Sequence, residues 1–302
     1  MPVSEETPYV AGLGRDLAPA TALFVTNQES VLRLHDKYEF IAWARSLDLP
    51  VPRTWRADDP GHAQVSREQP FVLKPRGACS GIGVQLRQPG TTVEPRDDHV
   101  VQERLEGRLL SSFTIARDGQ AIVTSVYEAT LLDGSVGVCF RRVDDADTIE
   151  SWIKTFVSAT EHTGFIAFDF IVDEAGVARA IECNPRATSG IHFIRSSSLP
   201  AAIAEPALPA GDPYREDVSL TEAYSGLTVA LRSLGGGDAR RTWRSLREAR
   251  DITWRGDDPW PFLLMMINTW RIVWLSASRR ISFAQAAVLD LRWTGTAERD
   301  AA

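Results

Sequence analysis

Two carboxylates and an amide that lie close together near residue 180 are the strongest chemical feature of this sequence. Asp169, Glu182 and Asn184 belong to FIAFDFIV-DEAG-VARAIECN, two apolar runs joined by a short acidic turn. This pattern predicts a β-hairpin. Oxygen ligands of this kind suit Mg²⁺, which usually also binds water and phosphate oxygens. An acidic hairpin on the solvent side of a sheet is the alternative, and spacing alone does not decide between the two.

The hairpin pattern also predicts how these side chains are arranged. If Val172 lies opposite Val177 across the turn, antiparallel pairing sets Asp169 opposite Ala180. Strand side chains alternate between faces, so we expect Ala180 on the polar face with Asp169 and the two other ligands. The opposite face then carries an apolar strip suited to a core: Phe168, Phe170, Val172, Val177 and Ile181.

A second segment, FVLKPRGACSGIGV at 71–84, has the composition of a phosphate-binding loop. Lys74 ends an apolar strand and is followed by three glycines, with Ser80 and Gly81 at the centre of the run. Glycines let backbone N–H groups approach phosphate oxygens, and the lysine adds a positive charge. The order of residues differs from a Walker A loop and from a dinucleotide fingerprint. Taken alone, the segment also fits an ordinary glycine-rich hairpin loop.

The rest of the sequence predicts the elements that position these residues. Residues 1–35 form a short segment rich in Pro, Thr and Ala, and helical periodicity begins at Asp36. Between 100 and 140, the runs VVQERL, SFTIAR, AIVTSVYEA and GVCF predict antiparallel strands. A helix around 147–161 precedes the hairpin. Beyond residue 199 the sequence becomes helical and rich in Ala, Arg and Trp.

Composition narrows the class of protein. The 302 residues are 44% hydrophobic and 24% charged, as in an ordinary globular protein, and the net charge of −7 argues against binding long nucleic acid. Three cysteines without CxxC spacing, and no signal-peptide pattern, predict a cytoplasmic protein with reduced thiols. The longest apolar stretch, 261–277, contains Asn268 and Arg271, so we expect a buried helix and no membrane span. An interfacial helix is the alternative, because the stretch carries Trp270 and Trp274.

Four motifs occur here in an order that resembles the ATP-grasp superfamily, which includes D-alanine–D-alanine ligase, biotin carboxylase and many amino-acid ligases. They are HDKYEF with Lys37, VLKPRGACSGIGV with Lys74, the strand VVQERLEG, and the DF…IECNPR hairpin. The resemblance covers about residues 36–198. It implies an α+β ATP-grasp fold, in which two α+β subdomains hold ATP between them, with a short N-terminal segment and a helical C-terminal region.

The resemblance also implies domain boundaries. The short N-terminal segment would occupy residues 1–35. Residues 36–99 would form subdomain A with the glycine-rich phosphate loop, and residues 100–198 subdomain B with the adenine linker and the metal site. Residues 199–302 would form the helical C-terminal region.

Binding roles follow from the same resemblance. Lys37 and Lys74 would contact the ATP phosphates, with Ser80 and Gly81 closing over them. In the linker strand, the Glu103 carbonyl and the Leu105 amide would match the adenine edge, and Gln102 would add a side-chain contact. Asp169, Glu182 and Asn184 would hold one or two Mg²⁺ ions between the phosphates.

Catalysis would rest on Lys74, at the ATP phosphates, and on Arg186, which would stabilise the transferring phosphoryl group or the substrate carboxylate. Two positions depart from the family pattern. Leu109 stands where most relatives carry a glutamate that binds ribose, and Ala167 stands where some ligases carry an arginine. Arg141 or Arg142, in the strand-like CFRRVD, would replace that arginine.

The implied activity is that of a Mg²⁺-dependent ligase that activates a carboxylate as an acyl phosphate and joins it to an amine. A phosphotransferase that uses the same nucleotide site, or a non-catalytic nucleotide- or partner-binding module, are the alternatives. The expected partners are small-molecule carboxylates and amines, with no nucleic acid and no membrane. Relatives usually carry a further domain before the first lysine, whereas 36 residues precede Lys37 here. A naturally short chain, the loss of that domain, and a wall supplied by a second copy of the chain or by a partner subunit are the alternatives.

Overall fold

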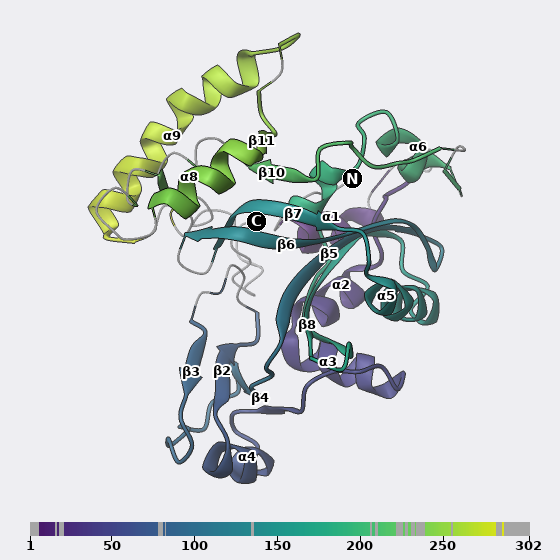
Figure 1. Cartoon of the computed structure of the whole chain (residues 1–302). Helices are drawn as coiled ribbons and strands as arrows, with labels where there is room; N and C mark the ends of the chain where they lie inside the picture. The colour runs from purple at the N-terminus through teal and green to yellow at the C-terminus, as the bar shows by residue number, and fades with distance from the viewer. Residues whose placement is uncertain are drawn as a thin grey trace, which may run out of the picture.

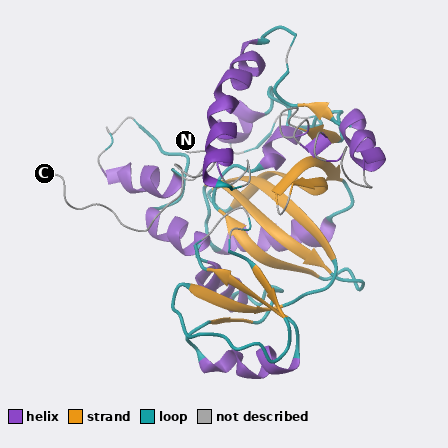
Figure 2. Cartoon of the chain, turned by 90° about the vertical axis from the view of Figure 1, so that its left-hand side faces the viewer, coloured by secondary structure: helices purple, strands orange, loops and turns teal. Residues whose placement is uncertain are grey.

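The chain folds around two β-sheets that form separate lobes, seen one above the other in Figure 1 and from the side in Figure 2. The computed structural model describes residues 6–15, 17, 21–77, 81, 83–133, 136–205, 207–208, 211–221, 226, 229–230, 233, 239–254, 256–281 and 286. The helical segments are α1 (Thr7–Gly12), η1 (Leu13–Arg15), α2 (Gln28–His35), α3 (Lys37–Ser46), η2 (Pro60–His62), α4 (Ala63–Glu68), α5 (Asp147–Ala159), η3 (Ser189–Phe193), α6 (Leu199–Ala204), α8 (Ala239–Glu248) and α9 (Trp260–Arg279). The strands are β1 (Thr54–Arg56), β2 (Phe71–Pro75), β3 (Gln85–Arg87), β4 (His99–Glu103), β5 (Arg108–Arg117), β6 (Gln120–Asp133), β7 (Val136–Val143), β8 (Gly164–Val172), β9 (Ala178–Asn184), β10 (Ser219–Thr221) and β11 (Arg250–Asp251).

The smaller lobe is a four-stranded antiparallel sheet of order β1-β4-β2-β3, covered on one face by α4. Side chains alternate along β2, so its two faces differ: one is apolar and packs into a core, and the other carries a charge. Phe71 and Leu73 pack with Val101 and Val65 into a small core. Lys74 lies on the opposite face, because it follows Leu73 by one residue. That face therefore carries the charged group.

The larger lobe is a seven-stranded sheet of order β11-β10-β7-β6-β5-β8-β9. Its pairs are antiparallel except β10 with β11. One face packs against α2, α3 and α5 through a core rich in aromatic rings. Trp152 of α5 is stacked on Phe156, and its ring contacts Phe168 and Phe170 of β8 edge-on. The other face packs against η3 and α6 through a second cluster that includes Phe113 and Phe193.

The hairpin of β8 and β9 forms as predicted, but its register differs from the prediction. Asp173 closes the turn, because its side chain accepts bonds from the Ala175 and Val177 amides, and Val172 consequently lies opposite Ala178. A β-bulge at Ile181 then shifts the pairing by one residue, so that Asp169 lies directly opposite Glu182. The prediction that Ala180 lies on the polar face is wrong: Ala180 lies opposite Phe170 and is buried in the aromatic core.

Most predicted elements are confirmed. The helix predicted from Asp36 is α3, and Asp36 caps it by accepting bonds from the backbone amides of Tyr38 and Glu39. The four antiparallel strands between 100 and 140 are β4 to β7, and the helix before the hairpin is α5. In the N-terminal segment, α2 is a helix that the sequence pattern did not predict.

The C-terminal region differs more from its prediction. It contains α6, α8 and α9, but it also adds β10 and β11 to the large sheet. The apolar stretch at 261–277 does form a helix, α9, yet the prediction of a buried helix is wrong, because much of its apolar surface is exposed. Within the part of the chain that the structure describes, no helix combines the length and apolarity needed to cross a membrane.

Candidate functional site

Two buried lysines meet where the lobes approach each other. The sequence contains three lysines among its 33 lysine and arginine residues, and two of them lie here. Lys37 at the start of α3 is 3% exposed, and Lys74 on β2 is 4% exposed. A buried ammonium is costly unless it has partners, so both positions imply anionic or carbonyl groups nearby.

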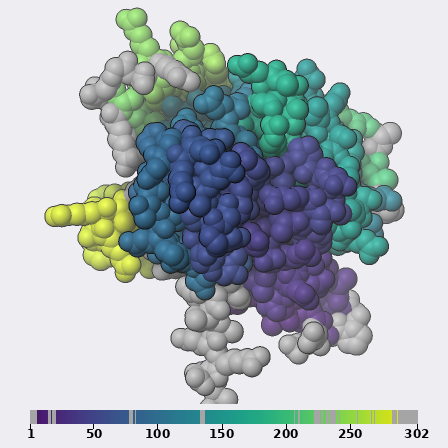
Figure 3. Space-filling view, turned by 90° about the horizontal axis from the view of Figure 1, so that it is seen from below, coloured from purple at the N-terminus to yellow at the C-terminus, as the bar shows by residue number. Residues whose placement is uncertain are grey.

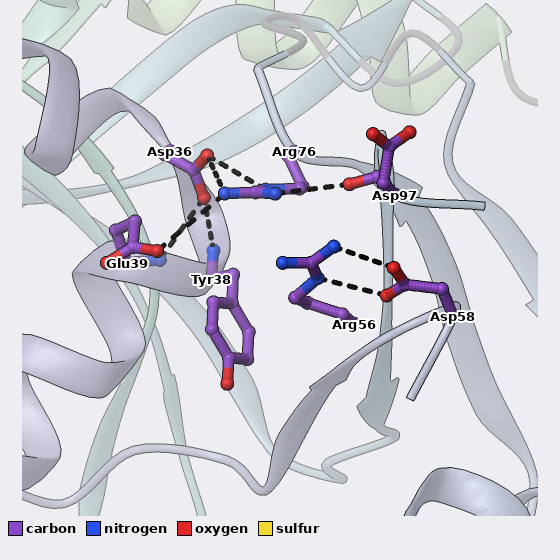
Figure 4. Close-up of polar contacts among 7 residues, drawn as sticks. All are labelled: Asp36, Tyr38, Glu39, Arg56, Asp58, Arg76 and Asp97. Atoms are coloured by element: carbon purple, nitrogen blue, oxygen red, sulfur yellow. Dashed lines mark hydrogen bonds and ion pairs between the residues drawn. The ribbon is translucent and has the colours of Figure 1, made fainter. Parts of the chain in front are cut away.

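Arg76 holds the two lysine segments side by side, and Figure 4 shows its contacts with Asp36 and Asp97. Arg76 follows β2, and its guanidinium pairs with the Asp36 carboxylate, with Nε–Oδ2 and Nη2–Oδ2 distances of 2.8 and 2.7 Å. The Arg76 carbonyl accepts a bond of 3.0 Å from the backbone amide of Lys37. The same guanidinium also donates to the Asp97 carbonyl. These contacts fix the start of α3 against the end of β2 and bring both lysines to one place.

The β8–β9 hairpin supplies the opposing charges. Glu182 Oε1 lies 3.4 Å from Lys37 Nζ. Asp169 lies opposite Glu182 in the sheet, and its Oδ1 accepts a 2.6 Å bond from the Ser111 hydroxyl on β5. Two carboxylates on adjacent strands repel each other unless cations are present. This pair therefore needs positive charge, which Lys37 and Lys74 provide in part.

The bulge gives Lys74 its partner. Ile181 has no opposite residue on β8, and its carbonyl accepts a 3.0 Å bond from Lys74 Nζ. This bond connects the small sheet with the β8–β9 hairpin of the large one. Burial lowers the pKa of Lys74 to about 8, although the negative charge of Glu182 acts to raise it. Desolvation and the neighbouring Glu182 charge raise the pKa of Asp169 to about 6.

Asn184 and Arg186 complete the polar face of the hairpin. Asn184 is buried, lies opposite Ala167, and its Oδ1 is 3.3 Å from Arg186 Nη2. Arg186 also donates to the carbonyl of Ala187, so the loop after β9 holds its guanidinium beside Asn184.

The donor set fits Mg²⁺ bound together with phosphate. Among the described residues, no group of three or more His, Cys, Asp and Glu side chains could hold a metal alone. Asp169, Glu182 and Asn184 offer two carboxylates and one amide oxygen. Mg²⁺ takes six oxygen ligands and commonly uses one or two carboxylates with substrate phosphates and water. Burial and, second to it, the charge of Glu182 raise the pKa of Asp169, and a cation would relieve the repulsion between these two carboxylates.

The linker residues lie at the junction of the two lobes. Gln102 is buried on the same face of the small sheet as Lys74, and its Nε2 donates to Thr54 Oγ1 at 3.0 Å. Glu103 ends β4 and pairs with Arg53 at 2.6 Å. Leu105 follows in the connection to β5. Gly81 has a positive φ of 68°, which only glycine adopts easily, and Ser80 lies outside the described residues.

Comparison with known proteins decides the family. A sequence model of the ATP-grasp domain matches residues 34–190, more than half of the chain. The chain belongs to the ATP-grasp family. The matched range contains Lys37, Lys74, Asp169, Glu182 and Arg186, so it includes the whole cluster of charges described above.

Solved structures with the ATP-grasp fold resemble this chain at low sequence identity. The biotin carboxylase domain of Hydrogenobacter thermophilus 2-oxoglutarate carboxylase, in complex with MgADP, matches with a TM-score of 0.56 and 13% identity over 71% of this chain and 55% of its own. A carboxyaminoimidazole ribonucleotide synthase from Aspergillus clavatus, complexed with ATP, gives 0.55 and 14% over 68% and 63%. Phosphoribosylamine–glycine ligase from Thermotoga maritima gives 0.51 and 14% over 67% and 62%. The chain thus spans 55–63% of the length of these three proteins, and at this identity the likeness establishes the fold.

The structure does not bring every predicted residue to the ATP-grasp site. Arg142 lies on the same face of the large sheet as Asp169, but three strands away, which at the usual strand spacing is roughly 14 Å. Its guanidinium lies 2.8 Å from Asp144, donates to the Arg215 carbonyl and covers the Tyr214 ring. Arg142 is therefore not in contact with the hairpin ligands.

Three residues that sequence reasoning missed belong to this site. Ser111 orients Asp169, Tyr127 lies opposite Ser111 and donates to Thr188 Oγ1, and Arg76 braces the two lysines. With Glu182, Asp169 and Arg142, Ser111 and Tyr127 form one polar row across five strands. The sequence offers one further indication of the site, the scarcity of lysine, because two of its three lysines lie inside the motifs.

Proposed function

We propose that this ATP-grasp protein is a Mg²⁺-dependent ligase that joins a carboxylate to an amine. The observation that carries the proposal is that Lys37 pairs with Glu182 and Lys74 binds the adjacent Ile181 carbonyl, although these segments lie more than 100 residues apart in the chain. In such a reaction the substrate carboxylate takes the terminal phosphoryl group of ATP, and the amine then displaces phosphate from the acyl carbon. The three compared structures are a carboxylase domain and two enzymes named as a synthase and a ligase, which supports this kind of chemistry.

In this proposal each cluster of side chains has a task. Lys37 and Lys74 bind phosphate oxygens as point charges, and Arg186 offers a planar guanidinium to the transferring phosphoryl group. Asp169, Glu182 and Asn184 hold Mg²⁺, whose charge would neutralise the phosphates. Ser111 keeps one Asp169 oxygen in place, so that the other faces the site. Catalysis then rests on position and charge, without a covalent enzyme nucleophile.

The linker would bind the adenine of ATP, and the far end of the polar row, at Arg142, would bind the other substrate. Glu103 and Leu105 stay our candidates for the adenine edge, with Gln102 beside them, and Ser80 and Gly81 for the loop over the phosphates. Arg142 is too far from Asp169 along the sheet to serve the phosphoryl group. Its place in the row suits contact with a substrate group beyond the reacting carboxylate.

ATP turnover with a panel of small carboxylates and amines tests the proposal. A ligase releases ADP and phosphate and yields an amide, which mass spectrometry detects. A stable phosphorylated product would support the phosphotransferase instead. Absence of Mg²⁺-dependent turnover across wide panels would support the non-catalytic module.

Conservative variants of Asp169 and Glu182 in the β8–β9 hairpin test the proposed metal site itself. We expect Asp169→Asn and Glu182→Gln to lower turnover by roughly 1,000-fold, because each removes a charge that holds the metal against the phosphates. Glu174→Gln is the matched control, since Glu174 lies exposed in the turn of the same hairpin and should leave turnover unchanged. Wild-type turnover in either site variant, with the metal still required, would remove these two residues from the proposed metal set.

A further inference from the structure

Helix α9 carries an exposed apolar face that the proposed ligase activity does not explain. It runs along the outside of the C-terminal region in Figure 1, and in Figure 3 the yellow end of the chain stands out beside the small lobe. Seven of its large apolar side chains have exposed fractions between 37% and 73%: Trp260, Leu263, Leu264, Ile267, Trp270, Val273 and Trp274. We call these seven residues the α9 seam.

The helix is apolar on both sides. Its inner side faces the rest of the chain, where Phe262 contacts Trp254 edge-on at 5.4 Å and Thr269 is buried. The α9 seam occupies the outer side, where a surface helix of a monomer normally carries polar residues. Arg271 and Arg279 are the charged residues between Trp260 and Arg279, and none is acidic. The exposed Arg271 lies beside the seam, and an exposed apolar face of this extent normally marks a contact site.

The spacing of the seam matches another helix. Trp260, Ile267 and Trp274 repeat every seven residues, and Leu263 and Trp270 repeat at the same interval three positions later. This is the a and d pattern by which two helices pack along a common seam. A second copy of the chain presents the same pattern, so two seams are complementary around a twofold axis.

The exposed area has the size that a dimer needs. With roughly 200 Å² for each large apolar side chain, the exposed fractions leave about 800 Å² of apolar surface on one chain. Two chains would bury about 1,600 Å² together, which is the size of a typical specific interface. A single chain would instead expose an apolar patch larger than the largest patches usual on monomers.

We infer that the chain forms a homodimer through the α9 seam. A lipid surface fits less well, because interfacial helices carry a strongly charged face opposite the apolar one, whereas the opposite face of α9 packs against its own chain. The interface lies outside the ATP-grasp region, so it is independent of the proposed reaction.

Sedimentation equilibrium of the full chain over a range of concentrations tests this inference. We expect the wild type to have twice the mass of one chain, and Ile267→Glu and Trp270→Glu to have the mass of one chain with unchanged far-UV circular dichroism. Leu86→Glu is the matched control, since Leu86 on β3 is 66% exposed and lies in the small lobe. It should remain dimeric.

Three results would overturn the inference. One is a wild type that stays monomeric at tens of micromolar, whether or not it floats with vesicles of phosphatidylcholine and phosphatidylserine. Flotation of such a monomer, lost in Trp270→Glu, would assign the seam to lipid. The others are a dimer that survives both seam variants, or one that Leu86→Glu dissociates as readily as they do.

Discussion

The ATP-grasp region and the C-terminal helices differ in how far their large apolar side chains are buried. Between residues 34 and 190, a cluster of aromatic rings lies buried under α3 and α5, and the buried Lys37 is paired with Glu182. In the C-terminal region, five tryptophans are at least half exposed: Trp243, Trp254, Trp260, Trp270 and Trp274. The first region covers its cluster of aromatic side chains within its own core. The second depends on something outside the chain to cover it.

Tryptophan substitutions should separate the two regions most clearly. We expect Trp152→Ala to lower the free energy of unfolding by roughly 3–5 kcal/mol, because its ring is buried among three phenylalanines and leaves a cavity. Trp270→Ala should change it by at most about 0.5 kcal/mol, because the ring is in solvent. Chemical denaturation measures both, in an Ile267→Glu background so that association does not contribute. Equal losses would show that α9 is packed as tightly as α5.

A pair of glycines offers a smaller contrast. A Cβ on Gly190 would lie 2.5 Å from Phe113 Cβ and 2.7 Å from the Tyr127 ring, so Gly190→Ala must push η3 away from the polar row. We expect a loss of roughly 2 kcal/mol in unfolding free energy, together with lower turnover. Gly256→Ala, in the C-terminal region, meets no atom within 4 Å and should be neutral. A neutral Gly190→Ala would mean that η3 shifts without strain.

The smallest predicted effect concerns the buried charge of the site. The pKa of Lys74 is about 8 in the free protein, so above that pH the ammonium is lost and a bound phosphate must restore it. Affinity for ADP without Mg²⁺ should therefore fall as pH rises beyond about 8, by at most about tenfold per pH unit. Calorimetric titration measures this. Lys74→Met should flatten the profile, and Lys154→Met, an exposed lysine on α5, should keep it. A flat wild-type profile would contradict the assignment.

Local patterns predicted the elements that carry the site. Asp36 signalled the start of α3, the two apolar runs predicted β8 and β9, and the order of motifs gave the ATP-grasp fold. These features depend on residues near each other in the sequence, which is why a single sequence reveals them.

Features set by tertiary contacts were not predictable. The bulge at Ile181 shifts the pairing that the Asp173 turn sets, and the Ile181 carbonyl binds Lys74, 107 residues away. The Asp36–Arg76 brace and the support of Asp169 by Ser111 join segments that no local periodicity relates. Arg142 was chosen by its place in a strand, whereas the strand order sets it apart from Asp169.

The scarcity of lysine has a practical consequence for labelling. An amine-reactive reagent finds Lys154 in solvent on α5, while Lys37 and Lys74 are shielded by the two lobes. The rate at which the two shielded amines are acylated then reports how often the lobes separate, and the acylation rate of the exposed lysine serves as the internal standard.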